Sequence, residues 1–177
     1  MTHICYTGGA AGADYIFERE SIKKRFKVVA YSFDDHNTKS KNRFILNKRQ
    51  LAEGFKHIKI TNNRLNRNIS NIDSYIKNLI SRDWFQVKNS DAVFAVGIII
   101  GNNVQGGTGY SISCAIDHKK TVYVYDQSYG NWFYYDYDDD QFQIYEGIPK
   151  LTEKFAGIGT RDINNDGVNA IIKLFNN

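Results

Sequence analysis

The 177-residue chain contains one proline, Pro149, and only two cysteines, Cys5 and Cys114. Both cysteines fall in apolar segments, so we expect buried free thiols rather than a disulfide. The two thiols and four histidines are scattered along the chain, whereas a metal site needs several ligands close together. The sequence therefore argues against a disulfide scaffold, and we expect neither a metal nor a cofactor.

Long apolar runs are also missing, since none approaches the ~20 residues that span a bilayer. The first residues lack the basic and apolar regions of a secretory signal. We therefore expect a cytoplasmic protein with no membrane partner. Hydrophobic residues make up 42% of the chain, which is enough for a core and argues against disorder. The length suits a single domain over residues 1–177.

Short apolar runs alternate with helical patterns along most of the chain. Strands are predicted at 3–7, 27–33, 91–100, 121–126 and after Pro149. Helices are predicted at 12–26, 44–65, 72–90 and 110–118 and at the end of the chain. In the first helix, one buried face is predicted to contain Tyr15, Ile16, Ile22 and Phe26.

The run at 91–100 is almost continuously apolar, which is typical of a buried parallel strand. Strand–turn–helix units of this kind predict an α/β fold, a Rossmann-like three-layer sandwich with a mostly parallel sheet. Residues 39–88 form a helical insertion in this scheme. Residues 131–145 alternate and turn around 138–140, which predicts a β-hairpin rich in aromatic residues.

Three glycine-rich segments follow predicted strands. They are Gly8-Gly9-Ala10-Ala11-Gly12, Gly106-Gly107-Thr108-Gly109 and Gly157-Ile158-Gly159-Thr160. Glycine lets the backbone approach a ligand closely, and the free N–H groups at a helix start favour an anion. In an open parallel sheet these turns lie at the carboxyl edge, where ligands bind. We therefore expect three phosphate-binding turns at one site, although none has the Gly-Lys-Ser/Thr of a P-loop.

The segment "YTGGAAGAD" resembles the "SGGAxGAD" turn of the SLOG superfamily. That group includes the Lonely Guy phosphoribohydrolases, the DNA-processing protein A family and small phage and bacterial Rossmann-like proteins. "VQGGTGYSISCAID" resembles its second motif, "PGGxGTxxE", and "FAGIGTRD" resembles its "GSR" turn, here near the C-terminus. The resemblance covers most of the α/β scaffold, but neither the helical insertion nor the hairpin.

The resemblance implies a nucleotide-derived ligand with phosphate on the first two turns. The phosphoribohydrolases have a catalytic glutamate after the second motif, and the matching position here is Ser113. We therefore expect a protein that binds an ADP-ribose-type or cyclic nucleotide-type molecule, for sensing or sequestration of a signalling nucleotide in phage counter-defence. The alternative is a nucleotide N-glycosidase or phosphoribohydrolase-type enzyme with a non-standard acid/base set, for which Asp14 and Asp162 are candidates.

Further side chains are candidates for the ligand site because of their place in these patterns. Trp84 and Gln86 precede the main buried strand and offer a stacking face and an amide for a base, although Trp84 equally suits helix packing. His36 ends the second strand and suits a phosphate contact or a place on the surface. Thr160 and Arg161, at the end of the third glycine segment, are candidate ligand residues as well.

Two regions indicate partners other than a small molecule. Residues 39–82 are basic, which suits nucleic acid, but the charges are spread around helices, so we rank this partner last. The hairpin has more aromatic residues than a small hairpin needs: Trp132, Phe133, Tyr134, Tyr135 and Tyr137. An exposed aromatic hairpin favours a homo-oligomer.

Overall fold

The computed structural model describes residues 3–177. Its central sheet contains β1 (Ile4–Thr7), β2 (Lys27–Ser32), β3 (Arg43–Ile45), β4 (Ala92–Gly97), β7 (Thr121–Asp126), β8 (Asn131–Asp136), β9 (Gln141–Ile144) and β10 (Lys154–Gly159). A small separate hairpin is formed by β5 (Ile99–Ile100) and β6 (Asn103–Val104). The helices are α1 (Ala13–Lys23), α2 (Lys48–Leu65), α3 (Ser74–Asn89), α4 (Thr108–Asp117) and α5 (Asn165–Leu174).

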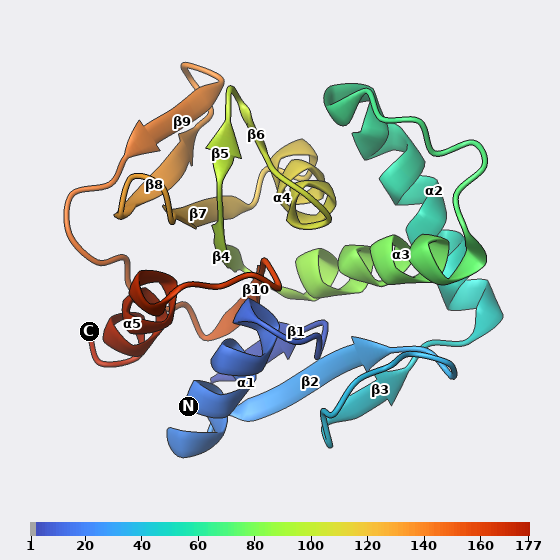
Figure 1. Cartoon of the computed structure of the whole chain (residues 1–177), viewed down its shortest axis with the longest axis horizontal. Coiled ribbons are helices and arrows are strands. Elements are labelled where there is room, and N and C mark those ends of the chain that lie inside the picture. The colour runs from blue at the N-terminus through green and yellow to red at the C-terminus, as the bar shows by residue number, and fades with distance from the viewer. Residues whose placement is uncertain (1–2) are drawn as a thin grey trace.

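The sheet has eight strands in the order β3-β2-β1-β10-β4-β7-β8-β9 (Figure 1). Strands β3 to β7 in this order are all parallel, and the hairpin β8–β9 continues the sheet in antiparallel pairing. The α/β class, the mostly parallel sheet and the antiparallel hairpin were predicted correctly. The last strand, β10, lies in the middle of the sheet between β1 and β4.

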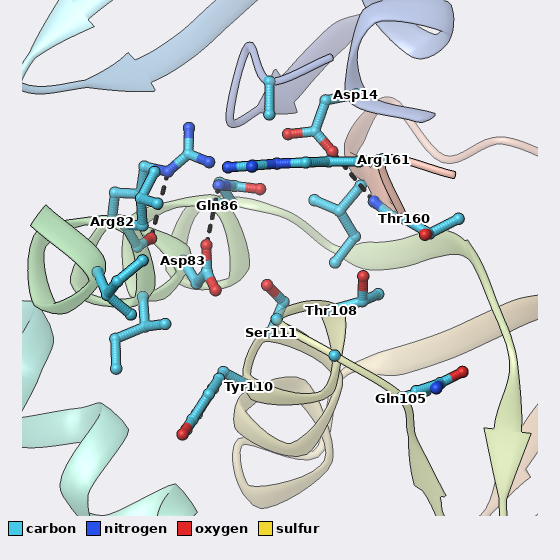
Figure 2. A pocket seen from close by; sticks show the side chains of 18 of the residues that line it. Asp14, Arg82, Asp83, Gln86, Gln105, Thr108, Tyr110, Ser111, Thr160 and Arg161 are labelled. Atoms are coloured by element: carbon cyan, nitrogen blue, oxygen red, sulfur yellow. Dashed lines mark hydrogen bonds between the residues drawn. The ribbon is translucent and has the colours of Figure 1, made fainter. Parts of the chain in front are cut away.

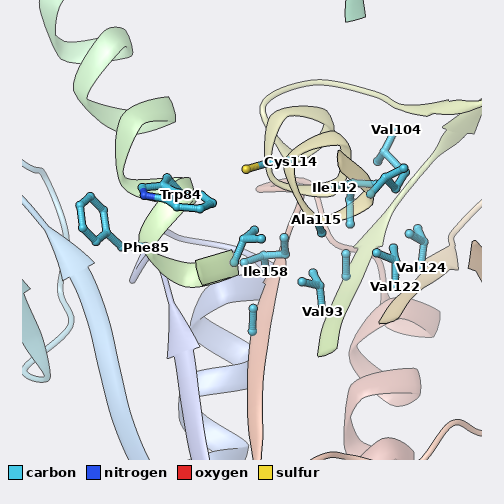
Figure 3. Close-up of a cluster of buried hydrophobic side chains, with 14 of the residues drawn as sticks. Trp84, Phe85, Val93, Val104, Ile112, Cys114, Ala115, Val122, Val124 and Ile158 are labelled. Atoms are coloured by element: carbon cyan, nitrogen blue, oxygen red, sulfur yellow. The ribbon is translucent and has the colours of Figure 1, made fainter. Parts of the chain in front are cut away.

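Helices cover both faces of the sheet. One face packs on α1 and α5 through a cluster that includes Phe17, Phe94, Phe155 and Ile171. The other face packs on α3 and α4, and Figure 3 shows the cluster between them, which includes Val93, Ile112 and Ile158. Helix α2 lies outside, against α3 and α4. Every residue of β4 is buried, as its continuous apolar run predicts.

The predicted start of the second helix is wrong. Residues 43–45 form an edge strand, β3, paired with the end of β2, and helix α2 begins at Lys48. The helix starts there because Asn47 and Gln50 form a capping box. The side-chain oxygen of each residue accepts a hydrogen bond from the backbone N–H of the other. Likewise the strand predicted over 91–100 ends at Gly97, and the next residues turn away into β5 and β6.

The predicted apolar face of the first helix is only partly correct, since Phe26 packs against the core but two of its other members do not. Ile16 and Phe17 are buried, whereas Tyr15 and Ile22 are half exposed. Phe17 fits because its ring lies directly over Gly157 of β10, where an added Cβ would come within 2.4 Å of the ring. Gly157 and its neighbours are therefore strand residues that admit Phe17, and the third predicted glycine turn is not a turn.

Several aromatic residues of the hairpin belong to the core. Trp132 and Tyr135 are buried on opposite faces of the sheet. Both cysteines are buried free thiols, as predicted. No helix in residues 3–177 is long and apolar enough to cross a membrane.

Candidate functional site

A cavity of about 470 Å³ opens at the carboxyl edge of the parallel strands (Figure 2). Four segments line it: the first glycine turn at Ala10, helix α3, the residues around the start of α4, and the end of β10 with the loop after it. The polar and charged residues of the lining are Asp14, Arg82, Asp83, Gln86, Gln105, Thr108, Tyr110, Ser111, Thr160, Arg161 and Asp162. Its size suits one nucleotide-sized molecule.

The second glycine turn is open toward this cavity. A Cβ added at Gly106 or Gly107 would meet nothing within 4 Å. Helix α4 starts here with no side-chain cap. Among residues 3–177, the N–H groups of Gly107 and Thr108 have no hydrogen-bond acceptor. Gly109 is different, since it lies against the carbonyl of Val104 and serves close packing. The open N–H groups at a helix start suit an anion.

The first glycine turn, in contrast, is filled by the protein itself. The carboxylate of Asp14 accepts hydrogen bonds from the N–H groups of Gly8 and Gly159, each at 3.0 Å. The guanidinium of Arg82 donates to the carbonyl of Gly8. Gly12 packs against the backbone of Thr160 and Arg161, where an added Cβ would come within 2.3 Å of a carbonyl oxygen. Asp14 therefore occupies the position expected for a ligand phosphate.

The residues of the first turn face a different cavity. Gly9, Ala10 and Gly12 line a hollow of about 740 Å³ between α1 and residues 37–42, and only Ala10 also lines the first cavity. The expectation that all the glycine turns would meet at one site therefore holds only in part, because the first turn contributes only Ala10 to the first cavity. The second turn and the end of β10 meet at the first cavity, while the first turn separates the two cavities.

Two arginines give the first cavity positive charge. Arg82 is buried, and its side chain donates to the carbonyls of Gly8, Tyr31 and Leu79 rather than to a carboxylate. Arg161 forms no ion pair within the part of the chain that the structure describes. In Figure 2 its side chain lies between those of Asp14 and Gln86. An anion in the cavity would meet at least one unpaired guanidinium.

Two buried carboxyl groups line the same cavity. Burial raises the pKa of Asp83 to about 7, although Arg82 and the hydroxyl of Ser111 oppose the shift. Burial also raises the pKa of Asp14 to about 6, against the effect of Arg82 and of the backbone N–H groups that it accepts. Asp162, the other acid that the sequence proposed, lies exposed at the cavity mouth. Asp83 is therefore the carboxyl best placed to exchange a proton near neutral pH.

Besides the glycines Gly8, Gly9, Gly12 and Gly109, two predicted ligand side chains lie outside the cavity. His36 is buried, with its ring stacked on Phe33 and its Nδ1 2.9 Å from the hydroxyl of Ser32. Burial and the charges of Arg82, Arg43 and Arg161 lower its pKa to about 3. Trp84 stacks on His57 with 3.7 Å between ring centroids and belongs to the core in Figure 3. Neither the imidazole nor the indole is free for a ligand, because each packs inside the protein.

Sequence reasoning missed the role of Arg82 and gave Asp83 no more weight than other acids. A signal was present, since Arg82, Asp83 and Gln86 flank the apolar pair Trp84 and Phe85 just before the main buried strand. Polar side chains on the buried face of a helix need a hydrogen-bond partner, which is either another protein group or a ligand. Gln86 itself was predicted as a ligand residue and does line the cavity.

Comparison of the chain with family models, curated proteins and solved structures returned no match. Residues 3–177 contain no cluster of three or more His, Cys, Asp or Glu side chains that could hold a metal ion.

Proposed function

We propose that the protein binds a nucleotide-derived molecule in the cavity at the start of α4. The observation that carries this proposal is the open second glycine turn, where the N–H groups of Gly107 and Thr108 have no acceptor among residues 3–177, in the same cavity that Arg161 lines. Together they suit a phosphate, which accepts several hydrogen bonds at once. The resemblance to the SLOG superfamily points to the same class of ligand.

The ligand class that we favour is an ADP-ribose-type or cyclic nucleotide-type molecule, held for sensing or sequestration. The position that matches the catalytic glutamate of the phosphoribohydrolases is Ser113, which is buried in α4 and does not line the cavity. This absence supports a binder rather than an enzyme of that kind. SLOG membership, a setting in phage counter-defence and a homo-oligomer formed through the hairpin stay predictions from the sequence.

The second candidate is an enzyme that cleaves the ligand, and Asp83 is the observation that favours it. Asp83 is buried at the cavity and has a pKa of about 7, which suits a general acid or base. Asp14 suits this role less well, because backbone N–H groups occupy both of its carboxylate oxygens.

A single incubation distinguishes the two functions. The purified protein is mixed with NAD, ADP-ribose, cyclic ADP-ribose isomers, cyclic dinucleotides and nucleoside monophosphates, and the mixture is chromatographed before and after heat denaturation. A compound that disappears and returns intact is bound, whereas a compound that returns as base and sugar phosphate is cleaved. If every compound stays free, both functions are wrong.

The phosphate contact is tested by calorimetry with Arg161→Ala. Loss of an unpaired guanidinium that meets the phosphate should weaken binding about 10-fold to 100-fold, since a charge-assisted contact contributes ~1.5–3 kcal/mol. Arg49→Ala is the matched control, because Arg49 is exposed on α2 and does not line the cavity. Equal affinities of the two variants would remove Arg161 from the site.

A further inference from the structure

Gln86 has a buried oxygen without a partner. Its side chain is 1% exposed, and its Oε1 has no hydrogen-bond partner among residues 3–177. A buried amide oxygen in this state costs about 1–3 kcal/mol. Such atoms are rare in folded proteins, and one that lines a cavity is explained by a ligand that donates to it. The other end of the amide, Nε2, lies 3.4 Å from a carboxylate oxygen of Asp83.

Asp83 determines which end of the amide faces the ligand. An ionised carboxylate only accepts hydrogen bonds, so the amide must present its NH₂ group to Asp83 and its oxygen elsewhere. Figure 2 shows this arrangement, with the Gln86 oxygen pointing away from Asp83 and toward the middle of the cavity. Gln86 is therefore fixed as a hydrogen-bond acceptor while Asp83 is ionised.

The surroundings of Gln86 suit a flat ring. Leu79, Ile80 and Ile158 line the same cavity and give it apolar walls. The Arg161 side chain, which lies over Gln86 in Figure 2, forms no ion pair with residues 3–177 and is exposed overall. A ring that reaches Gln86 takes the place of this guanidinium, which is then free to meet the phosphate.

We infer that Gln86, oriented by Asp83, selects a ligand ring that presents an N–H donor, as an amino-substituted base does, over a ring that presents a carbonyl oxygen. The inference rests on the proposed function, because it concerns the base of the same nucleotide-derived ligand. Gln86 acts as the specificity residue, and Asp83 as its positioning residue. A carbonyl at that place would face the Gln86 oxygen, so two acceptors would be buried against each other.

The inference is tested with pairs of nucleotides that differ only at this edge. AMP is compared with IMP, and CMP with UMP, by calorimetry on the unchanged chain at pH 8, where Asp83 is ionised. We expect the amino-bearing member of the better-binding pair to bind at least 10-fold more tightly. The two pairs also show whether the cavity takes a purine or a pyrimidine.

Two variants assign the preference to Gln86 and Asp83. Gln86→Leu should bring the two affinities within about 2-fold of each other, and Asp83→Asn should reduce the preference because an amide no longer fixes the Gln86 orientation. In the unchanged chain the preference should fall as the pH drops below 7, and in Asp83→Asn it should not change. The charged and polar groups that face Asp83 include Arg82 and Gln86 of α3, Asp14 of α1, and Ser111 and Cys114 of α4.

The possible results separate this inference from the proposed function. If both members of each pair bind equally to the unchanged chain, the cavity takes nucleotides and the inference about Gln86 is wrong. The inference is also wrong if Gln86→Leu keeps the full preference. If none of the four nucleotides and none of the larger panel binds, the proposed function fails and the inference falls with it. The nucleotide pairs need no variant, so a folding defect in Gln86→Leu would not prevent the test.

Discussion

The first and second glycine turns look alike in the sequence but differ in what surrounds them. Around the first turn, Asp14 and Arg82 fill the space next to Gly8, and backbone atoms press on Gly12. Around the second turn, the space next to Gly106 and Gly107 is empty. A glycine pattern therefore indicates close approach of some group, and only the structure shows whether that group is the protein's own or a ligand's.

The largest effect predicted from this comparison is on the stability of the protein. Gly12→Ala should lower the free energy of unfolding by roughly 3 kcal/mol or more, because Gly12 has a φ of 89° and its new Cβ would overlap a carbonyl oxygen. Gly107→Ala is the matched control, with a φ of −60° and open space around it. It should range from no change to a gain of about 1 kcal/mol. Urea unfolding measures both, and similar losses in the two variants would contradict the comparison.

The next effect concerns Asp14, which closes the first turn. Asp14→Ala removes the acceptor of the Gly8 and Gly159 N–H groups and leaves both inside the protein. We expect a loss of about 2–3 kcal/mol in urea unfolding. Asp162→Ala, which changes an exposed acid at the cavity mouth, should cost less than about 0.5 kcal/mol. An unchanged midpoint for Asp14→Ala would show that the turn does not depend on it.

Asp83 faces the open second turn, and its effect depends on pH. Folding raises its pKa to about 7 from an ordinary value near 4, so folding favours the protonated form. The contribution of Asp83 to stability is therefore complete below pH 4 and is lost as the pH rises through 7. Asp83→Asn removes this loss and should be more stable than the unchanged chain at pH 8 by roughly 2 kcal/mol, because the shift of about three pKa units corresponds to ~4 kcal/mol and burial of the new amide offsets part of it. Thermal unfolding from pH 4 to pH 8 measures the difference, which should shrink toward the acid end.

The smallest predicted effect is on binding at the second turn. Gly107→Ala places a methyl group in the open space beside the free N–H groups. Its affinity for AMP should fall about 10-fold, equivalent to ~1.4 kcal/mol. Gly101→Ala is the control, since Gly101 also has open space around it but does not line the cavity, and its φ of 59° makes this variant the more strained of the two. A loss of affinity in the Gly101 variant alone would place the ligand elsewhere.

The sequence predicts the layered fold well because strand and helix periodicities are local. The continuous apolar run of β4 and the alternation of β8 and β9 both carry this signal. The edge strand β3 is not predicted, because its three residues continue the helical pattern of the next segment. They are recognised as a strand only from their pairing with β2. The place of β10 between β1 and β4 has no local signal, because it depends on contacts between distant segments.

The candidate site was predicted in part for the same reason. The second glycine turn, Gln86 and Arg161 line the cavity as the sequence suggests. His36 and Trp84 were misplaced, because each has a protein ring stacked on it that no local pattern shows. Arg82 was missed since its partners, the carbonyls of Gly8 and Tyr31, are far from it along the chain.

The central position of β10 also constrains the order of folding. Until residues 154–159 leave the ribosome, β1 and β4 each expose an unpaired edge, and no strand joins the two halves of the sheet, although helix α3 packs against β1, β2 and α4. Pairing between strands that are far apart in the sequence is slow, so the sheet is complete only after β10 has paired with both β1 and β4. The cavity is completed at the same moment, because Thr160 and Arg161 follow directly after β10. The cavity and the joined sheet therefore form together.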